Sequence, residues 1–169
     1  MSAGAQSVVV RPATPDDVER IYGFIVELAV YEREPDGVSG TAEMLGEALF
    51  GERPSAEALI AEVDGEAAGF ALFHSTFSTW ECLPGIWLED LFVPERHRKA
   101  GVGRALLSHL AAVAIRRGCP RLEWHALDWN ELALGFYRRV GAERLPEWDL
   151  HRLYGAALRD VAEAAGPLQ

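Results

Sequence analysis

The chain has few cysteines and little positive charge, and both shortages argue against particular classes of site and of binding partner. Its 169 residues include only two cysteines, Cys82 and Cys119, which lack the Cys-x-x-Cys spacing of zinc and redox sites and are too few for a secreted disulfide framework. A reducing cytoplasm therefore suits the protein. Sixteen Lys and Arg stand against 26 Asp and Glu, a formal net charge of −10. Such a chain repels phosphate backbones and anionic lipid, which argues against nucleic-acid or membrane partners and favours small cationic molecules.

Long apolar runs are also absent. No run reaches the roughly 18 residues that span a bilayer, and the first residues lack the charged start and apolar core of a signal peptide. Hydrophobic residues still make up 49% of the chain, as in globular proteins that bury a core. The length fits one domain over residues 1–169, with frayed tails at 1–6 and about 160–169. The five histidines show no metal-ligand spacing, so no metal is predicted.

Hydrophobic periodicity predicts strands alternating with helices. The predicted strands are 7–11, 58–63, 67–73, 86–93, 122–126 and 149–154. The predicted helices are 15–33, a shorter one after Thr41, 101–117, 131–140 and an Ala-rich helix from about 156. Asp64-Gly65 is a strong hairpin signal between the second and third strands. This order predicts one α/β structure with helices on both faces of a sheet.

The segment from Val93 to Arg104 is a strand end, a basic turn and two glycines that open a helix. A helix N-terminus presents unpaired backbone N–H groups and the positive end of its dipole, and glycine lets a ligand approach the backbone closely. The turn therefore predicts an anion site such as one for pyrophosphate, to which Arg98, Lys99 and Arg104 would add charge. The alternative is an ordinary solvated turn. It is neither a dinucleotide fingerprint nor a Walker loop, because the required glycine and Gly-Lys-Ser/Thr are missing.

The residues from Arg98 to Gly103 resemble the Gln/Arg-x-x-Gly-x-Gly/Ala signature of the GNAT superfamily of acyl-CoA-dependent N-acetyltransferases. Leu88–Val93, Trp129–Glu131, Gly135–Arg139 and Gly141-Ala142 resemble its spermidine/spermine and thialysine branch, and the resemblance covers about residues 7–158. It implies a GNAT fold, whose mixed, mostly antiparallel central sheet has a V-shaped split and helices on both faces. It also implies an acetyl-CoA-dependent enzyme and a homodimer.

Two residues match the family's catalytic positions. Glu89 matches the general base that takes a proton from the substrate ammonium through water, and Tyr137 matches the acid that protonates the coenzyme A thiolate. Strict strand alternation places Glu89 between Trp87 and Leu91, where it would be desolvated as suits a base, and places Asp90 on the opposite face. The alternative for Glu89 is a polar residue at a strand end whose hydrogen bonds are satisfied within the protein. The alternative for Tyr137 is an aromatic residue of the core.

Acetyl-CoA is expected in a gap between the strands 86–93 and 122–126, with its pantetheine amides paired to backbone groups. Asn130 matches the residue that contacts the pantetheine arm, although an ordinary helix N-cap explains it equally well. The predicted cofactor-binding residues are Leu91, Phe92, Val93, Arg98, Lys99, Ala100, Gly101, Val102, Gly103, Arg104, Asn130 and Tyr137. The amine would attack the thioester directly, without a cysteine nucleophile.

Cationic amines need carboxylates or aromatic faces. The predicted substrate-binding residues are Tyr31, Glu32, Glu89, Asp90 and Trp148, with weaker candidates at Trp80, Glu147 and Asp149. The branch usually has glycine where Lys99 stands, and residues 78–84 do not resemble the polyamine enzymes closely. The sequence therefore predicts acetyl transfer to a polyamine or diamine. The alternatives are a thialysine, lysine-like or peptide amine acetyltransferase, or a non-catalytic acyl-CoA-binding module.

Overall fold

The computed structural model describes residues 7–166, and the chain divides into two compact units. The N-terminal unit runs to His125 and the C-terminal unit starts at Ala126. The predicted frayed tail at 1–6 and the last three residues of the other tail lie outside the described residues. That the whole chain forms one domain stays a prediction.

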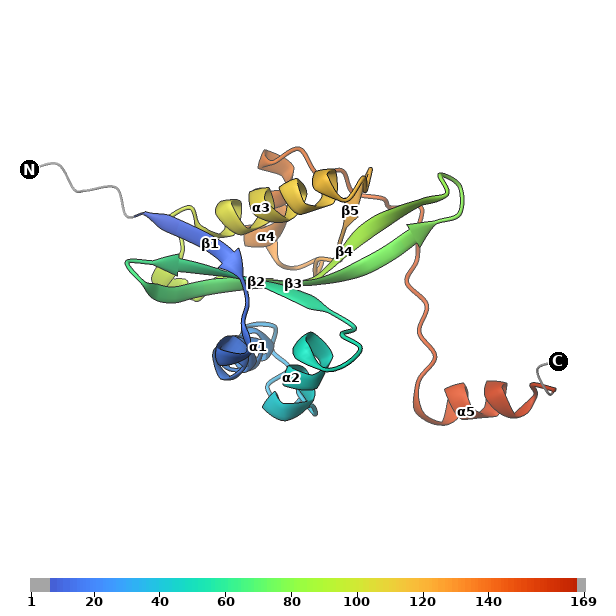
Figure 1. The fold of residues 1–169 in the computed structure, drawn as a ribbon. Coiled ribbons are helices and arrows are strands. Elements are labelled where there is room, and N and C mark those ends of the chain that lie inside the picture. Colours follow the sequence, from blue (N-terminus) through green and yellow to red (C-terminus); the bar gives the residue numbers. More distant parts are fainter. Residues whose placement is uncertain (1–6, 167–169) are drawn as a thin grey trace, which may run out of the picture. The chain divides into compact units, whose positions relative to one another are not determined.

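The N-terminal unit is a five-stranded sheet with three α-helices (Figure 1). The strands, in both chain and sheet order, are β1 (Val8–Pro12), β2 (Glu57–Val63), β3 (Glu66–Ser78), β4 (Leu83–Phe92) and β5 (Leu122–Glu123). The helices are α1 (Val18–Tyr31), α2 (Ala42–Phe50) and α3 (Val102–Arg116), and short 3-10 turns cover Pro15–Asp17 and Glu95–His97. β1 to β4 pair antiparallel, and β4 and β5 pair parallel.

Local signals explain where these elements begin and end. Asp64 and Gly65 both have positive φ, 53° and 83°, as a two-residue hairpin turn requires between β2 and β3. Thr41 caps α2, because its hydroxyl accepts a hydrogen bond from the N–H of Met44 at 3.3 Å. Gly118 follows α3 with φ of 68°, a left-handed ending that glycine tolerates without strain. The predicted hairpin and the predicted helix starts are confirmed.

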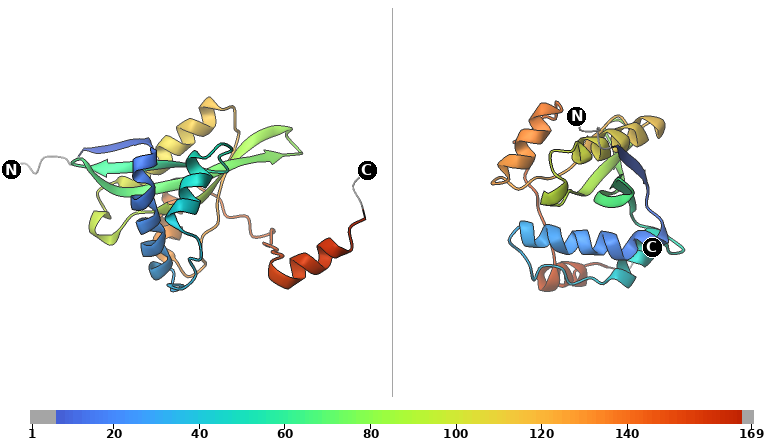
Figure 2. Two further views of the ribbon diagram at one scale, coloured as in Figure 1. Left: turned by 60° about the horizontal axis from the view of Figure 1, so that its bottom comes forward. Right: turned by 90° about the vertical axis from the view of Figure 1, so that its left-hand side faces the viewer.

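Helices cover both faces of the sheet, as predicted. Figures 1 and 2 show α3 on one face and α1 with α2 on the other. The core beneath α1 and α2 contains two fully buried rings, Phe24 and Phe70, which stack with centroids 6.0 Å apart. The other buried members of this core cluster are Ile21, Leu49, Ala58, Ile60, Leu72 and Phe92. This packing fixes the position of α1 against the carboxyl end of β4.

The last two strands of the sheet separate soon after they meet. β5 pairs with β4 only at Ile86↔Leu122 and Trp87↔Glu123, and it is shorter than the predicted strand 122–126. From Leu88 to Phe92, β4 has no strand partner on that side among the described residues. The divergence agrees with the V-shaped split of the expected fold, and the predicted mixed, mostly antiparallel sheet is confirmed.

The C-terminal unit contains two short helices, α4 (Glu131–Arg139) and α5 (Gly155–Glu163), both at predicted positions. The predicted strand 149–154 is wrong, because these residues have no regular structure. Within the described part of this unit there is no other strand to pair with their backbone groups, and all six residues are exposed. α5 includes residues 160–163 of the tail that was expected to fray.

Candidate active site

The turn before α3 is open to an anion. Gly101, the N-cap of α3, has φ of 83°, and no side chain caps the first backbone N–H groups of this fully described turn. The first turn of α3 also contains no acidic residue that would neutralise the helix dipole. Val102 is buried and anchors the helix, so only its backbone can face a ligand. Ala100 and Gly103 are half-buried, and Arg104 is exposed.

Arg98 is directed into the protein instead of toward this opening. Its Nε donates to the carbonyl oxygen of Val93 at 3.0 Å, and its guanidinium lies 4.6 Å from the ring centroid of Tyr31. Arg96 makes a second link to the same helix through Glu27, at 3.2 Å. The two arginines therefore join the turn to α1. They leave Lys99 and Arg104 as the exposed cations of the predicted anion site.

Lys99 adopts a backbone conformation that favours glycine. Its φ is 67°, in the left-handed region, where a Cβ atom costs about 1–2 kcal/mol. The family resemblance implies glycine at this position, and this φ gives a physical reason for that preference. The side chain of Lys99 is exposed.

A β-bulge in β4 changes the predicted faces of its acidic residues. Leu72 pairs with Asp90 and Phe73 pairs with Leu88, so Glu89 is the extra residue. The prediction from strict alternation, that Glu89 and Asp90 lie on opposite faces of the strand, is therefore wrong. Asp90 lies opposite Leu72, a member of the core cluster under α1 and α2, and Glu89 contacts side chains on that same face.

Glu89 has polar neighbours and is accessible to solvent. Its Oε2 accepts a hydrogen bond from the indole Nε1 of Trp87 at 3.0 Å, and it lies 3.9 Å from Nε2 of His74. The Glu89 side chain is 57% exposed, so the predicted desolvation of this carboxylate is wrong. The bulge causes the difference, because it turns the residue away from a regular, packed strand position.

The desolvated carboxyl group is Asp90. Burial, followed by the nearby charges of Glu89 and Glu32, raises the pKa of Asp90 to about 6. Burial also raises the pKa of Glu32, which directly follows α1. Asp90 is therefore the carboxyl group on which the charges of Glu89 and Glu32 act, and we call these three residues the carboxylate cluster. Such a cluster attracts cations, and Asp90 would lose its proton more readily beside one.

The free side of β4 offers backbone groups to an extended ligand. The side chain of Phe92 is buried in the core cluster, and Leu91 and Val93 are half-buried. Val93 also packs at the start of α3, 3.7 Å from where a Cβ on Gly103 would lie. The side chains of these predicted cofactor-binding residues thus have structural contacts, which leaves their backbones for a ligand such as a pantetheine arm.

The remaining predicted residues belong to the C-terminal unit. Asn130 caps α4, its Oδ1 accepting from the N–H of Ala133 at 3.2 Å, so the helix-cap interpretation is confirmed. Tyr137 is half-buried within α4, with its ring centroid 5.3 Å from that of Phe136. Trp148 is 67% exposed in an irregular segment. The catalytic and binding roles of all the predicted residues stay predictions.

The side chains of His74 and Trp87 lie beside Glu89, and neither was predicted as a site residue from the sequence. His74 on β3 pairs across the sheet with Trp87, and Trp87 also contacts the ring of His125 edge-on at 4.5 Å. From the sequence, His74 was considered only with the other four histidines, as a possible metal ligand. The contact between His74 and Glu89 could not be predicted from the sequence, because it depends on the bulge in the pairing of β3 with β4.

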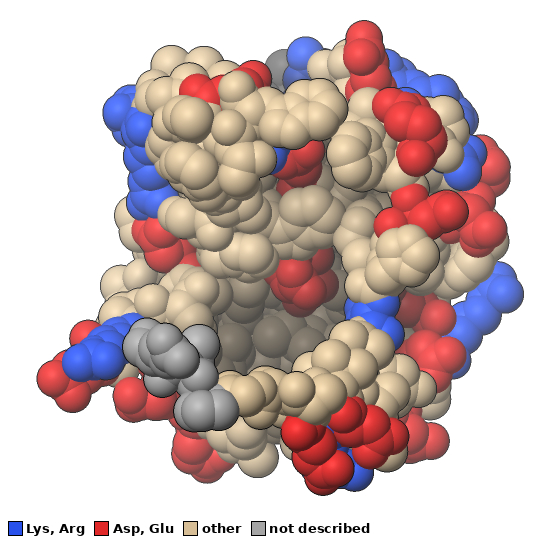
Figure 3. All heavy atoms as spheres, turned by 90° about the vertical axis from the view of Figure 1, so that its right-hand side faces the viewer, with Lys and Arg blue, Asp and Glu red and all other residues tan. Residues whose placement is uncertain are grey.

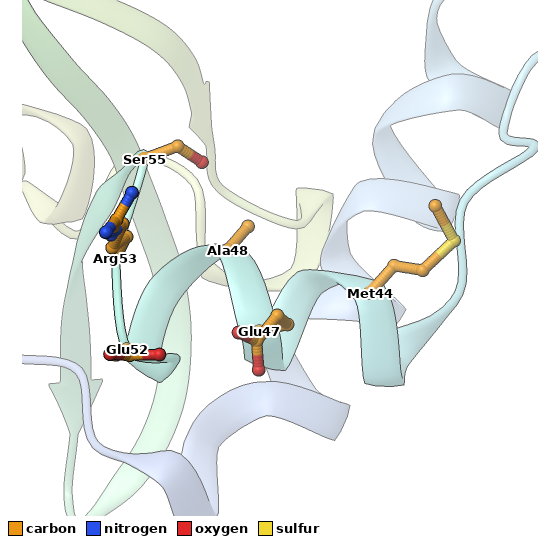
Figure 4. Close-up of a pocket in the computed structure, with 6 residues that line it drawn as sticks. All are labelled: Met44, Glu47, Ala48, Glu52, Arg53 and Ser55. Carbon is orange, nitrogen blue, oxygen red and sulfur yellow. The ribbon is translucent and has the colours of Figure 1, made fainter.

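Other surface features hold none of the predicted site residues. Figure 4 shows a hollow beside α2, lined by Met44, Glu47, Ala48, Glu52, Arg53 and Ser55. Acidic side chains are spread over the face drawn in Figure 3, in keeping with the net charge. Within residues 7–166, no group of three or more His, Cys, Asp or Glu could hold a metal ion. No helix in the described part of the chain is long and apolar enough to span a membrane.

Comparison with known proteins agrees with this architecture. The model of the acetyltransferase (GNAT) family matches residues 20–142. A thialysine N-epsilon-acetyltransferase from Bos taurus is 36% identical over 92% of this chain and 97% of that protein. A human spermidine/spermine N(1)-acetyltransferase-like protein 1 is 30% identical over 90% of this chain and 23% of that protein. Among solved structures, an integron cassette protein from the mobile metagenome of V. cholerae superposes with a TM-score of 0.78 at 28% identity, covering 94% of this chain and 99% of that one.

The fold and the open α3 turn define an acyltransferase of the α/β class. The chain belongs to the GNAT family of acetyltransferases, and it is an N-acetyltransferase enzyme similar to the thialysine and spermidine/spermine branch. Enzymes of this family in general take their acyl group from acetyl-CoA.

Proposed function

We propose that this enzyme transfers the acetyl group of acetyl-CoA to a primary amine of a small polycationic molecule, a diamine or polyamine. The observation that carries this proposal is the carboxylate cluster of Glu32, Glu89 and Asp90. The charges of Glu32 and Glu89 act on Asp90, and burial raises the pKa of both Asp90 and Glu32, so a ligand with more than one positive charge would stabilise these groups. The human relative is named for polyamines, spermidine and spermine, and the bovine relative is named for the amino acid thialysine.

Acetyl-CoA fits the residues of the α3 turn and the free side of β4. The uncapped N–H groups after Gly101, together with Lys99 and Arg104, would hold the pyrophosphate. The backbone of Leu91 to Val93 would pair with the pantetheine amides as a neighbouring strand does. Asn130 would contact the same arm from α4.

The reaction is a direct transfer. Glu89 takes a proton from the substrate ammonium, and the freed nitrogen lone pair attacks the thioester carbonyl carbon. The C–S bond then breaks, and the hydroxyl of Tyr137 gives its proton to the departing thiolate. The attacking nitrogen then loses its second proton, which returns to Tyr137 through solvent, and Glu89 releases its proton to solvent. The net products are the acetylated amine, coenzyme A and one proton. The neutral phenol is suited to this task, because an acid must start protonated.

A diamine suits the cluster better than an amino acid does. The α-carboxylate of thialysine or lysine carries the same charge as Glu32, Glu89 and Asp90 and would be repelled by them, while Arg98 is already engaged with Val93 and Tyr31. The second ammonium of a diamine instead meets Asp90 and Glu32. Thialysine is the second candidate, since the bovine relative with that name matches nearly the full length.

The assembly we propose is a homodimer in the cytoplasm. No described residue of the C-terminal unit is fully buried, and several of its large apolar side chains are more than half exposed. These are Leu132, Leu145, Trp148, Leu150, Leu153, Tyr154, Leu158 and Val161. A second copy would cover part of this surface, which sedimentation velocity would detect as twice the monomer mass. Cys82 and Cys119 are both free thiols, as suits a reducing compartment.

The test is release of coenzyme A thiol from acetyl-CoA with a panel of spermidine, spermine, putrescine, thialysine, lysine and a basic peptide. We expect turnover with the diamine and polyamines first, and loss of at least about 100-fold in kcat/KM for Glu89→Gln. Glu163→Gln, the same change at an exposed residue of α5 that belongs to no predicted site, is the control. Tight acetyl-CoA binding without turnover of any amine would favour a non-catalytic acyl-CoA-binding module.

A further inference from the structure

His74 faces the predicted base from the neighbouring strand. It lies on β3 opposite Trp87, and its Nε2 is 3.9 Å from Oε2 of Glu89. The side chains of His74 and Glu89 are 38% and 57% exposed, so a small molecule can reach both.

The hydrogen bond on the other side of the imidazole sets its tautomer. Nδ1 of His74 lies 3.2 Å from the carbonyl oxygen of Ser75. A carbonyl oxygen can only accept, so Nδ1 must carry the proton. In the neutral ring Nε2 then has a lone pair and no hydrogen. The atom that faces Glu89 is therefore an acceptor.

Two acceptors that face each other require a donor between them. Oε2 of Glu89 is held in place by the indole N–H of Trp87 at 3.0 Å, and it cannot donate to Nε2 of His74. A single donor about 2.8 Å from each atom spans a separation of 3.9 Å at an angle of about 90°. A primary ammonium, with three N–H groups, can satisfy both acceptors at once.

We infer that Nε2 of His74 and Oε2 of Glu89 form a two-acceptor cradle for the primary ammonium group of the substrate. This inference rests on the proposed function and adds to it a residue that determines specificity. The cradle holds the reacting nitrogen, and it leaves Asp90 and Glu32 for the second cation. A quaternary ammonium, which has no N–H, cannot occupy it.

Two substitutions at His74 separate this role from a packing role. His74→Phe keeps an aromatic ring on β3 and removes the acceptor, and His74→Gln keeps an acceptor oxygen on a side chain of similar reach. At pH 8, we expect the phenylalanine variant to raise the KM for putrescine about tenfold, the effect of one hydrogen bond to a charged group. We expect the glutamine variant to stay within about threefold of the wild type. Equal KM values in the two variants, high or low, would overturn the cradle.

A second measurement requires no turnover. In the full chain with coenzyme A bound, ¹⁵N NMR of the histidine rings should show the Nδ1–H tautomer for His74, with an Nε2 resonance that shifts on adding putrescine and does not shift on adding choline. An Nε2–H tautomer, or an Nε2 signal that ignores putrescine, would refute the inference. If putrescine shifts the Nε2 resonance but is not acetylated, the cradle is supported and the proposed activity is wrong. If putrescine is acetylated without shifting the resonance, the proposed activity is supported and the cradle is wrong.

Discussion

The two units of this chain differ in how they hold their predicted site residues. In the N-terminal unit a packed core with Phe24 and Phe70 lies beneath α1, and it supports Glu32 and Asp90 at the edge of that core. In the C-terminal unit Tyr137 and Asn130 lie on a nine-residue helix, and no described residue of the unit is fully buried. The difference teaches that the proposed amine-binding residues lie beside a packed core. The proposed proton donor is instead carried by an element with little packing inside its own unit.

The largest expected effect contrasts the packing of the two units. Phe70→Ala removes a fully buried ring that stacks on Phe24, and should cost about 3–5 kcal/mol of unfolding free energy. Leu158→Ala, at a side chain 51% exposed on α5, should cost less than about 0.5 kcal/mol. Urea unfolding of both variants checks the contrast. Similar losses would show that the C-terminal unit has a core of its own.

The second largest effect is expected at Tyr137, the proposed proton donor. Tyr137→Phe should lower kcat about 100-fold, because it removes the proton donor and keeps the ring beside Phe136. The Kd for acetyl-CoA should change by less than about twofold. Steady-state kinetics and calorimetry give the two values. An unchanged kcat would exclude Tyr137 as the acid.

Asp90→Asn should stabilise the protein and weaken catalysis. Because burial raises the pKa of Asp90 to about 6, the folded state holds its proton more strongly than the unfolded state does. The stability contributed by that proton is complete below pH 4 and is lost as the pH rises through about 6. The variant should therefore gain on the order of 1–2 kcal/mol at pH 8 and almost nothing at pH 4. Chemical unfolding at both pH values checks this, with Asp149→Asn in the C-terminal unit as the control, and equal gains at both would contradict it.

The smallest effect concerns the α3 turn. Lys99→Gly should raise the unfolding free energy by about 0.5–1 kcal/mol, because glycine accepts the φ of 67° without strain at some cost in chain entropy. Lys99→Ala keeps the Cβ atom and should give no gain. Thermal unfolding distinguishes the two variants. An equal gain from alanine would show that the side chain, and not the backbone, limits stability.

Much of the N-terminal unit could be predicted from the sequence because its signals are local. Asp64-Gly65 set the hairpin, Thr41 capped α2, and the glycines and basic residues before α3 marked the open turn. The face of Glu89 could not be predicted in this way. Its bulge arises from the pairing of β4 with β3, and alternation along one strand contains no information about an extra residue.

The strand predicted at 149–154 failed for a related reason. A strand requires a neighbour, and sequence pattern alone does not show whether one is present. The burial of Asp90 likewise depends on α1 packing against β4, two segments far apart in the chain. Non-local contacts thus decided each point on which sequence and structure disagree.

The central claim is that the carboxylate cluster recognises a second positive charge. The most direct test compares kcat/KM for putrescine with that for n-butylamine, which has the same carbon chain and one ammonium, in the wild type and in Asp90→Asn. The account predicts a preference for putrescine of about 100-fold or more in the wild type, reduced about tenfold or more in the variant. Equal kcat/KM values for the two amines in the wild type would contradict it.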